Sequence, residues 1–122
     1  MSKAGKLRVT EYLEHILEAV KRIHLYVNGM TKQQFLEDDK TQDAVIRNFE
    51  IIGEACRNID SRHPAYAKEH PEVPWGIAYE MRNTLAHGYF KVDLEIVWTT
   101  IYQDLPDLAE QISNLLRQSH DA

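Results

Sequence analysis

The sequence predicts an all-α fold, a bundle of four or five helices. Apolar residues recur at spacings of three and four along most of the chain, which is the period of an amphipathic helix, and no alternating apolar and polar stretch typical of a strand occurs. The chain has 122 residues, a length that favours a single domain over residues 1–122. Helical segments with short connections are typical of a bundle.

Composition excludes several classes of protein. Hydrophobic residues make up 43% of the chain and charged residues 27%, so the sequence is not of the disordered kind. Its apolar runs are far shorter than the ~20 residues of a membrane span, and no apolar signal core follows the N-terminus. We therefore expect no membrane contact and a cytoplasmic location. The single cysteine, Cys56, excludes an internal disulfide and fits a reducing compartment.

The net charge of -5 argues against a broad basic face of the kind that binds duplex DNA. If the partner is a nucleic acid, the attraction must come from a local group of basic residues.

The first predicted helix follows Thr10, which we expect to be its N-cap. Its apolar stripe consists of aliphatic residues: Leu13, Ile16, Leu17, Val20, Ile23 and Val27. Asn28 and Gly29 end this helix, because both residue types tolerate the left-handed conformation. Thr31 and Gln34 then have the spacing of a capping box that opens a short second helix.

A longer helix is expected to begin at Thr41, after the polar residues 37–40. Its apolar residues alternate steps of four and three, the pattern of a seam between packed helices: Val45, Phe49, Ile52, Cys56 and Ile59. We expect Cys56 to be a small buried residue and not a nucleophile. Residues 60–74 contain three prolines and are expected to form a loop or a broken helix.

Two more helices complete the predicted bundle. Pro74 is expected at the first position of the fourth helix, which stops at Gly88. Asp93 is expected to cap the last helix, whose apolar side spans residues 94–116, with a kink at Pro106.

One segment contains more polar chemistry than packing requires: Arg82, Asn83, His87 and Tyr89 lie around the end of the fourth helix. A guanidinium can bind a phosphate and stabilise the extra negative charge of a phosphorane transition state. An imidazole moves protons near neutral pH, and with a ribose 2′-hydroxyl as the nucleophile it needs no metal. DNA lacks that hydroxyl, so this chemistry indicates RNA.

The same residues also fit a solvated arginine, a histidine that caps a helix end and an exposed tyrosine. Residue chemistry alone does not decide between these two interpretations.

The spacing of Arg82 and His87 indicates how these two side chains could reach one substrate, and it favours a homodimer. Five residues turn an ideal helix by about 140° from the starting direction, so a straight helix does not aim both side chains at one atom. Gly88 allows the backbone to leave the helix and turn His87. A two-fold homodimer would bring two copies of each residue into one cleft, which would be locally basic.

The pattern Arg-Asn-x-x-x-His-x-Tyr formed by these four residues resembles the signature of the HEPN superfamily, in particular that of the HepT-like toxins of type VII-like HepT/MntA toxin–antitoxin systems. Further segments resemble the same family in the same order: residues 52–55, 71–75, 87–90, 92–98 and 104–106. The likeness covers nearly the whole chain. It implies an all-α, HEPN-like homodimer with a metal-independent endoribonuclease site, no cofactor, and a minimal MntA-like nucleotidyltransferase antitoxin as partner.

Residue by residue, the resemblance gives Arg82 and His87 the catalytic positions and Asn83 a supporting one. Tyr89 takes the position at which the antitoxin transfers AMP from ATP, a modification called AMPylation. A phosphate attached two residues from His87 would add negative charge and bulk at the cleft, so AMPylation is expected to silence the enzyme.

Two other functions are open alternatives. In one, the chain is a non-catalytic helical adaptor that binds the nucleotidyltransferase, with Arg82 and His87 in an interface. In the other, Glu11, His15 and Glu18 on one side of the first helix hold a metal ion. The metal alternative needs Glu50 or Glu54 from another helix. The competing interpretation is that these residues simply form an exposed, charged side of the first helix. The histidines of the proline-rich stretch, His63 and His70, are candidate RNA contacts or ordinary loop residues.

Overall fold

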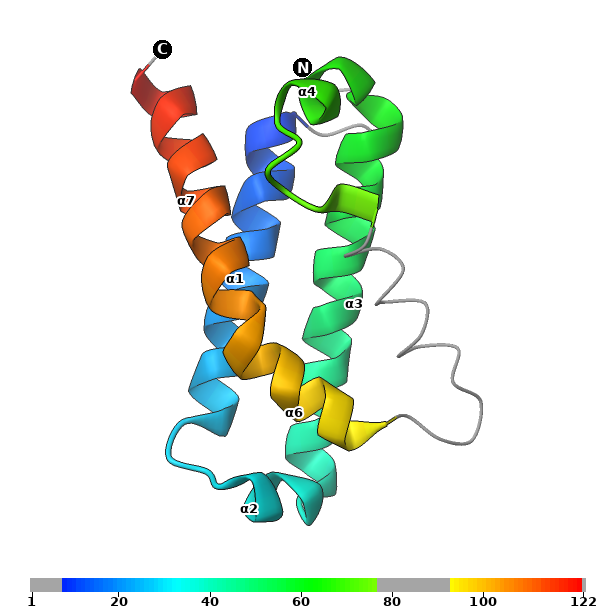
Figure 1. Cartoon of the computed structure of the whole chain (residues 1–122), viewed down its shortest axis with the longest axis vertical. Helices are drawn as coiled ribbons and strands as arrows, with labels where there is room; N and C mark the ends of the chain where they lie inside the picture. Colours follow the sequence, from blue (N-terminus) through cyan, green and yellow to red (C-terminus); the bar gives the residue numbers. More distant parts are fainter. Residues whose placement is uncertain (1–7, 77–92, 122) are drawn as a thin grey trace.

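The computed structural model describes residues 8–76 and 93–121, and in those ranges all regular structure is helical (Figure 1). The six helices with both ends described follow one another in this order: α1 Val9–Val27, α2 Lys32–Leu36, α3 Asp39–Arg62, α4 Pro64–Glu69, α6 Leu94–Gln103 and α7 Leu105–Asp121. The predicted all-α class is therefore confirmed. None of the helices in these ranges is both long and apolar enough to cross a bilayer.

Helix α1 begins earlier than predicted. Its N-cap is Arg8, and Thr10 lies inside the first turn, so the expectation of a Thr10 cap is wrong. The reason is that Glu11 accepts a hydrogen bond from the backbone N–H of Arg8 at 2.9 Å, which satisfies a donor at the helix start. The predicted end is confirmed: Gly29 follows the helix in the left-handed region, at φ +80°.

The capping box of the short helix α2 is confirmed. The Thr31 hydroxyl accepts from the N–H of Gln34 at 3.1 Å, and the Gln34 side chain accepts from the N–H of Thr31 at 2.8 Å. Its Phe35 is fully buried, and the Phe35 carbonyl accepts from the buried Gln42 amide at 2.9 Å. This contact attaches α2 to α3.

Helix α3 also begins before the predicted Thr41. Asp38 caps it by accepting from both the N–H and the hydroxyl of Thr41, at 3.0 and 2.9 Å, so the polar stretch is the helix start and not an interruption. The five residues of the predicted seam are all buried. The predicted broken helix is confirmed as well, because α3 ends at Arg62 and α4 starts at Pro64.

The chain after Asp93 forms two helices where one kinked helix was expected. Asp93 caps α6 as predicted, accepting from the N–H groups of Glu95 and Ile96 at 3.1 and 3.2 Å. At Asp104 the helix breaks and α7 starts one residue before Pro106. Proline has no N–H, and its ring clashes with the carbonyl four residues earlier, so Pro106 fits the first turn of a new helix better than a helix interior.

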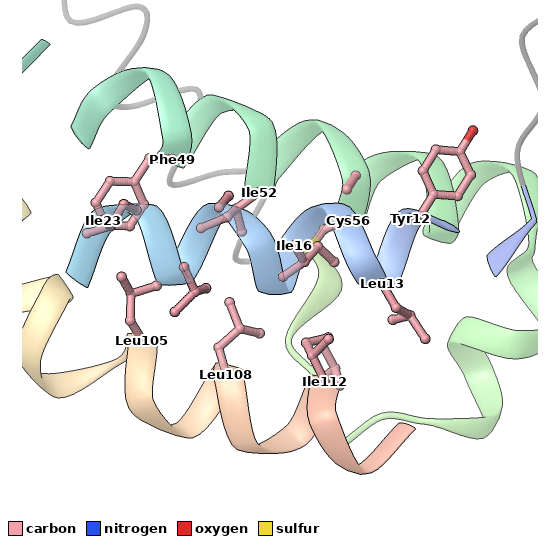
Figure 2. Packing of buried hydrophobic residues seen from close by; sticks show 14 of the residues in the cluster. Tyr12, Leu13, Ile16, Ile23, Phe49, Ile52, Cys56, Leu105, Leu108 and Ile112 are labelled. Atoms are coloured by element: carbon pink, nitrogen blue, oxygen red, sulfur yellow. The ribbon is translucent and has the colours of Figure 1, made fainter. Parts of the chain in front are cut away.

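The three long helices α1, α3 and α7 run side by side and enclose the core (Figure 1). Figure 2 shows Leu105, Leu108 and Ile112 of α7 facing the apolar residues of α1 and α3. Burying one aliphatic side chain contributes about 1.5–3 kcal/mol, so this shared core is the main source of stability.

Candidate functional site

The residues predicted to carry catalysis, Arg82, Asn83, His87 and Tyr89, lie outside the described residues. Their roles, and the homodimer that would bring two copies together, remain predictions. The structure defines the two ends between which these residues lie, at Trp75–Gly76 and at Asp93.

The first of these ends is fixed by Trp75. The helix after α4 begins at Trp75, directly after Pro74, within one residue of the predicted start. The Trp75 indole is 5% exposed, and its Nε1–H donates to the carbonyl of His70 at 3.1 Å. The Trp75 backbone N–H donates to Val73 O at 2.9 Å. These contacts place the start of the segment against the core.

The residues next to Trp75 stabilise the same loop. The Tyr66 and His70 rings have centroids 4.5 Å apart, and His70 Nδ1 lies 3.3 Å from a Glu72 carboxylate oxygen. Burial, with the nearby carboxylates of Glu72 and Glu69, raises the pKa of Tyr66. His70 thus has packing partners within the loop, which favours its interpretation as a structural residue.

The second end is fixed by the start of α6. The Asp93 cap sets where the helix begins, and the Leu94 side chain packs against the core. Glu95 forms an ion pair with Lys32 of α2 at 3.3 Å, and the rings of Phe35 and Trp98 lie 5.3 Å apart. Helix α2 therefore holds the first two turns of α6.

The geometry required by the metal alternative is not found. Among residues 8–76 and 93–121, no three His, Cys, Asp or Glu side chains come together as a metal site. Glu11 is instead bonded to Arg8, and Glu18 pairs with Arg22 at 3.5 Å. His15 is exposed, with its ring 6.5 Å from that of Tyr12. This side of α1 has the expected character of a charged surface.

Cys56 is not a nucleophile. The side chain is fully buried, and desolvation together with the nearby Asp60 charge raises its pKa to about 12. The neutral thiol therefore persists at physiological pH, as the sequence predicted.

The sequence interpretation missed a groove between α3 and the α6–α7 corner, of about 360 Å³. Its lining includes four buried apolar residues: Phe49, Ile52, Leu105 and Leu108. It also includes three exposed carboxylates: Glu72, Asp104 and Asp107. We call this the acidic groove. No sequence signal could have found it, because its residues come from three segments that are distant along the chain.

The family model described as "Ribonuclease HepT-like" matches residues 16–115, a range that contains all four predicted site residues. The chain belongs to this family.

Relatives of similar length support the assignment. The "Probable ribonuclease HepT" of Thermococcus cleftensis is 42% identical over 105 residues, which is 86% of this chain and 93% of the relative. A protein of Methanocaldococcus jannaschii is 37% identical over 112 residues, 92% of this chain and 90% of its own. One of Caldanaerobacter subterraneus is 36% identical over 107 residues, 88% of this chain and 93% of its own. Both carry provisional RNase names. No solved structure is a significant match.

Proposed function

We propose that this protein is the ribonuclease toxin of a type VII-like HepT/MntA toxin–antitoxin system. The observation that carries the proposal is membership of the ribonuclease HepT-like family over residues 16–115, together with the intact Arg-Asn-x-x-x-His-x-Tyr pattern inside that range. The presence of a single cysteine, which excludes an internal disulfide, fits action in the cytoplasm.

The proposed reaction uses the RNA's own 2′-hydroxyl. His87 accepts the 2′ proton while the 2′-oxygen attacks phosphorus, and the same imidazole returns a proton to the departing 5′-oxygen. The phosphorus–O5′ bond breaks, which leaves a 2′,3′-cyclic phosphate and a 5′-hydroxyl. Arg82 binds the phosphate and stabilises its added charge, and Asn83 supports that geometry by hydrogen bonding. No metal takes part in these steps, and a homodimer supplies two copies of the pair.

The proposed antitoxin is a minimal MntA-like nucleotidyltransferase that AMPylates Tyr89. The phenol oxygen attacks the α-phosphate of ATP, the phenolic proton is lost to base, and pyrophosphate leaves. The resulting phosphodiester puts a negative charge beside Arg82 and occupies the place of the substrate phosphate.

RNA cleavage in EDTA tests the enzyme. Wild-type protein and a His15→Ala control, changed at an exposed histidine of α1, are expected to cut RNA equally. His87→Ala is expected to lose at least 100-fold in rate, since acid–base catalysis contributes about 10²–10⁴-fold. Circular dichroism checks that both variants fold. If wild type and His87→Ala are equally inert, the non-catalytic adaptor is the better description; activity that needs added metal contradicts the mechanism.

Intact-mass measurement tests the antitoxin. After incubation with the nucleotidyltransferase and ATP, wild type is expected to gain one adenylate and to stop cutting RNA. Tyr89→Phe should gain none at that position, and Tyr26→Phe, changed at an exposed tyrosine of α1, should behave as wild type. Adenylation of Tyr89→Phe to the same extent would exclude Tyr89 as the target.

A further inference from the structure

Helix α6 exposes a different kind of surface from the two longest helices, α1 and α3. Eight of the nine exposed residues of α3 are charged, and so are four of the seven exposed residues of α1. Among the five exposed residues of α6, Glu95 alone is charged, and its carboxylate pairs with Lys32 of α2 at 3.3 Å. We call these five residues the α6 surface: Glu95, Ile96, Thr99, Tyr102 and Gln103.

Two large apolar side chains belong to the α6 surface. Ile96 is 54% exposed and Tyr102 is 49% exposed. Residues three apart are neighbours on a helix, and Thr99 is three residues from each of them. An uncharged strip therefore runs across α6 from Ile96 through Thr99 to Tyr102.

Isolated exposed apolar residues are ordinary, and Leu25 of α1 is one of them, at 69% exposed. Its neighbours three and four residues earlier, Arg22 and Lys21, are both charged and exposed. The strip on α6 differs because two apolar side chains lie on it together and its one charge is already compensated. An exposed apolar patch of this kind marks an interaction surface.

The α6 surface is complementary to itself. A two-fold axis places residue i of one subunit against residue j of the other, and j against i. If α6 crosses its own copy antiparallel at Thr99, Ile96 meets Tyr102 of the partner subunit. In the same register Glu95 meets Gln103 of the partner subunit, so a carboxylate faces an amide donor. Apolar groups thus meet apolar groups, and no like charges meet at the centre.

The acids at the two ends of α6 do not oppose this pairing. Asp93 is engaged as the N-cap, where it accepts from two backbone N–H groups. Packed helices cross at about 20–50°, so the end at Asp93 and the end at Asp104 diverge from the second copy. The contact is closest at Thr99, whose small side chain allows the approach.

We propose that the α6 surface is the face through which two copies of this chain pair. The inference rests on the proposed function, whose catalytic pair needs a second copy because Arg82 and His87 diverge by about 140° on a helix. His87 precedes Asp93, where α6 is capped, by six residues, a stretch that spans at most about 22 Å. Pairing through α6 can therefore bring two copies of His87 to one cleft.

The α6 surface supplies the centre of the interface and not all of it. A helix of 10 residues is about 15 Å long. A stable interface takes about 800 Å² from each partner, with an apolar centre and a polar rim. The rim comes from surface on either side of α6.

Sedimentation velocity of the full-length protein over a dilution series measures the pairing. Wild type is expected to sediment as a dimer. Thr99→Arg sets two like charges against each other at the axis and should weaken self-association at least about 100-fold. Ile96→Glu buries a charge against an apolar partner and should weaken it at least about tenfold. The matched control Leu25→Arg changes a more exposed apolar residue on α1 and should behave as wild type. Circular dichroism checks that each variant folds.

Disulfide trapping tests the register. Packed helices have axes about 8–10 Å apart with Cα atoms about 2.3 Å from each axis, so facing Cα atoms at the crossing lie about 3.5–5.5 Å apart. A disulfide spans Cα separations of about 4.4–6.8 Å. With oxidised glutathione as the oxidant, Thr99→Cys should form a covalent dimer and Leu25→Cys should not. A mixture of Ile96→Cys and Tyr102→Cys should cross-link more than either variant alone.

Several outcomes would overturn the proposal. A wild type that is monomeric at every concentration, or equal self-association of Thr99→Arg and Leu25→Arg, would each do so. A Thr99→Arg variant that stays dimeric but melts at a lower temperature would assign the α6 surface to a contact within the chain. A monomeric wild type that binds the nucleotidyltransferase, with binding lost in Thr99→Arg, would assign it to that partner.

RNA cleavage is measured on the same samples, so the two proposals can fail separately. A dimer that depends on Thr99 and cuts no RNA supports pairing through the α6 surface and contradicts the ribonuclease. A monomeric wild type that cuts RNA does the reverse.

Discussion

Replacing Trp75 by phenylalanine tests how firmly the start of the motif-bearing segment is anchored. Trp75 is the last buried residue before residues 77–92, and its Nε1–H donates to the His70 carbonyl at 3.1 Å. Phenylalanine keeps an aromatic ring in the same place but removes this donor and part of the buried volume.

The expected loss is about 2 kcal/mol of unfolding free energy. The His70 carbonyl keeps a second donor, the backbone N–H of Val73 at 3.3 Å, so it is not orphaned, and the lost bond costs only its net value of ~1 kcal/mol. The smaller ring leaves a cavity of roughly 40 Å³, which at ~24 cal/mol per Å³ adds about 1 kcal/mol.

Trp98→Phe is the matched control. Trp98 is only half-buried, it stacks on Phe35 and Tyr102 with centroids 5.3 and 4.8 Å away, and no hydrogen bond from its indole occurs among the described residues. This variant should lose at most about 1 kcal/mol, because half-buried packing is all that it gives up.

Urea unfolding followed by circular dichroism measures both variants, at two protein concentrations because the midpoint of a dimer depends on concentration. With a slope of about 2 kcal/mol per M, the Trp75→Phe midpoint should lie about 1 M below that of wild type. A Trp75→Phe midpoint equal to that of wild type, or no lower than that of Trp98→Phe, would refute the anchoring role of the indole hydrogen bond.

Three further predictions concern individual residues. Hydrogen bonds from the backbone N–H and the hydroxyl of Thr41 lower the pKa of Asp38 below its usual 3.8. The Asp38 cap therefore stabilises the fold above pH 3.8, and this stabilisation is lost as the pH falls through the lowered pKa. In Asp38→Asn, the free energy of unfolding measured in urea should fall less steeply as the pH is lowered. Gly29→Ala should cost about 1 kcal/mol, because φ at Gly29 is +80° although no described atom would crowd the added Cβ. Gly76→Ala, at a helical position where no described atom would crowd the Cβ either, should be neutral or slightly stabilising. Equal melting temperatures for the two variants would contradict the strain argument. The Cys56 thiol, with its pKa raised to about 12, should resist iodoacetamide at pH 8 in the native protein and react once the protein is unfolded. Because the thiol of the unfolded chain ionises at a lower pH, the free energy of unfolding should fall as the pH rises from about 9 toward 12. The fall should be smaller in Cys56→Ala. Rapid alkylation of the native protein would show that the core opens there.

Much of the fold was already determined by local sequence. The three-and-four spacing of apolar residues marked the buried sides of α1, α3 and α7, because that spacing keeps a side chain on one face of a helix. The caps at Thr31 and Asp93 were predictable because their side chains bond to backbone groups three or fewer residues away. The sequence also predicts the chemistry of Arg82, Asn83, His87 and Tyr89, and this prediction lies outside the described residues.

The errors in helix boundaries arose where local signals compete. Thr10 and Thr41 are good N-cap types, but both helices start before them. The Glu11 carboxylate accepts from the N–H of Arg8, and the Asp38 carboxylate accepts from the N–H of Thr41. At Pro106 the sequence indicated a disturbance of the helix, and its form, a break at Asp104, depends on how α6 and α7 pack on the core.

Only the tertiary structure decided which residues share a surface. Glu72, Asp104 and Asp107 carry no common motif, and they line one groove only because the loop before Trp75 and the α6–α7 corner both pack beside Phe49 and Ile52 of α3. Periodicity specifies which side of a helix is buried, since that depends on residues within a few turns. Which neighbour that side packs against depends on the whole core. For this reason the acidic groove could be found only in the folded structure.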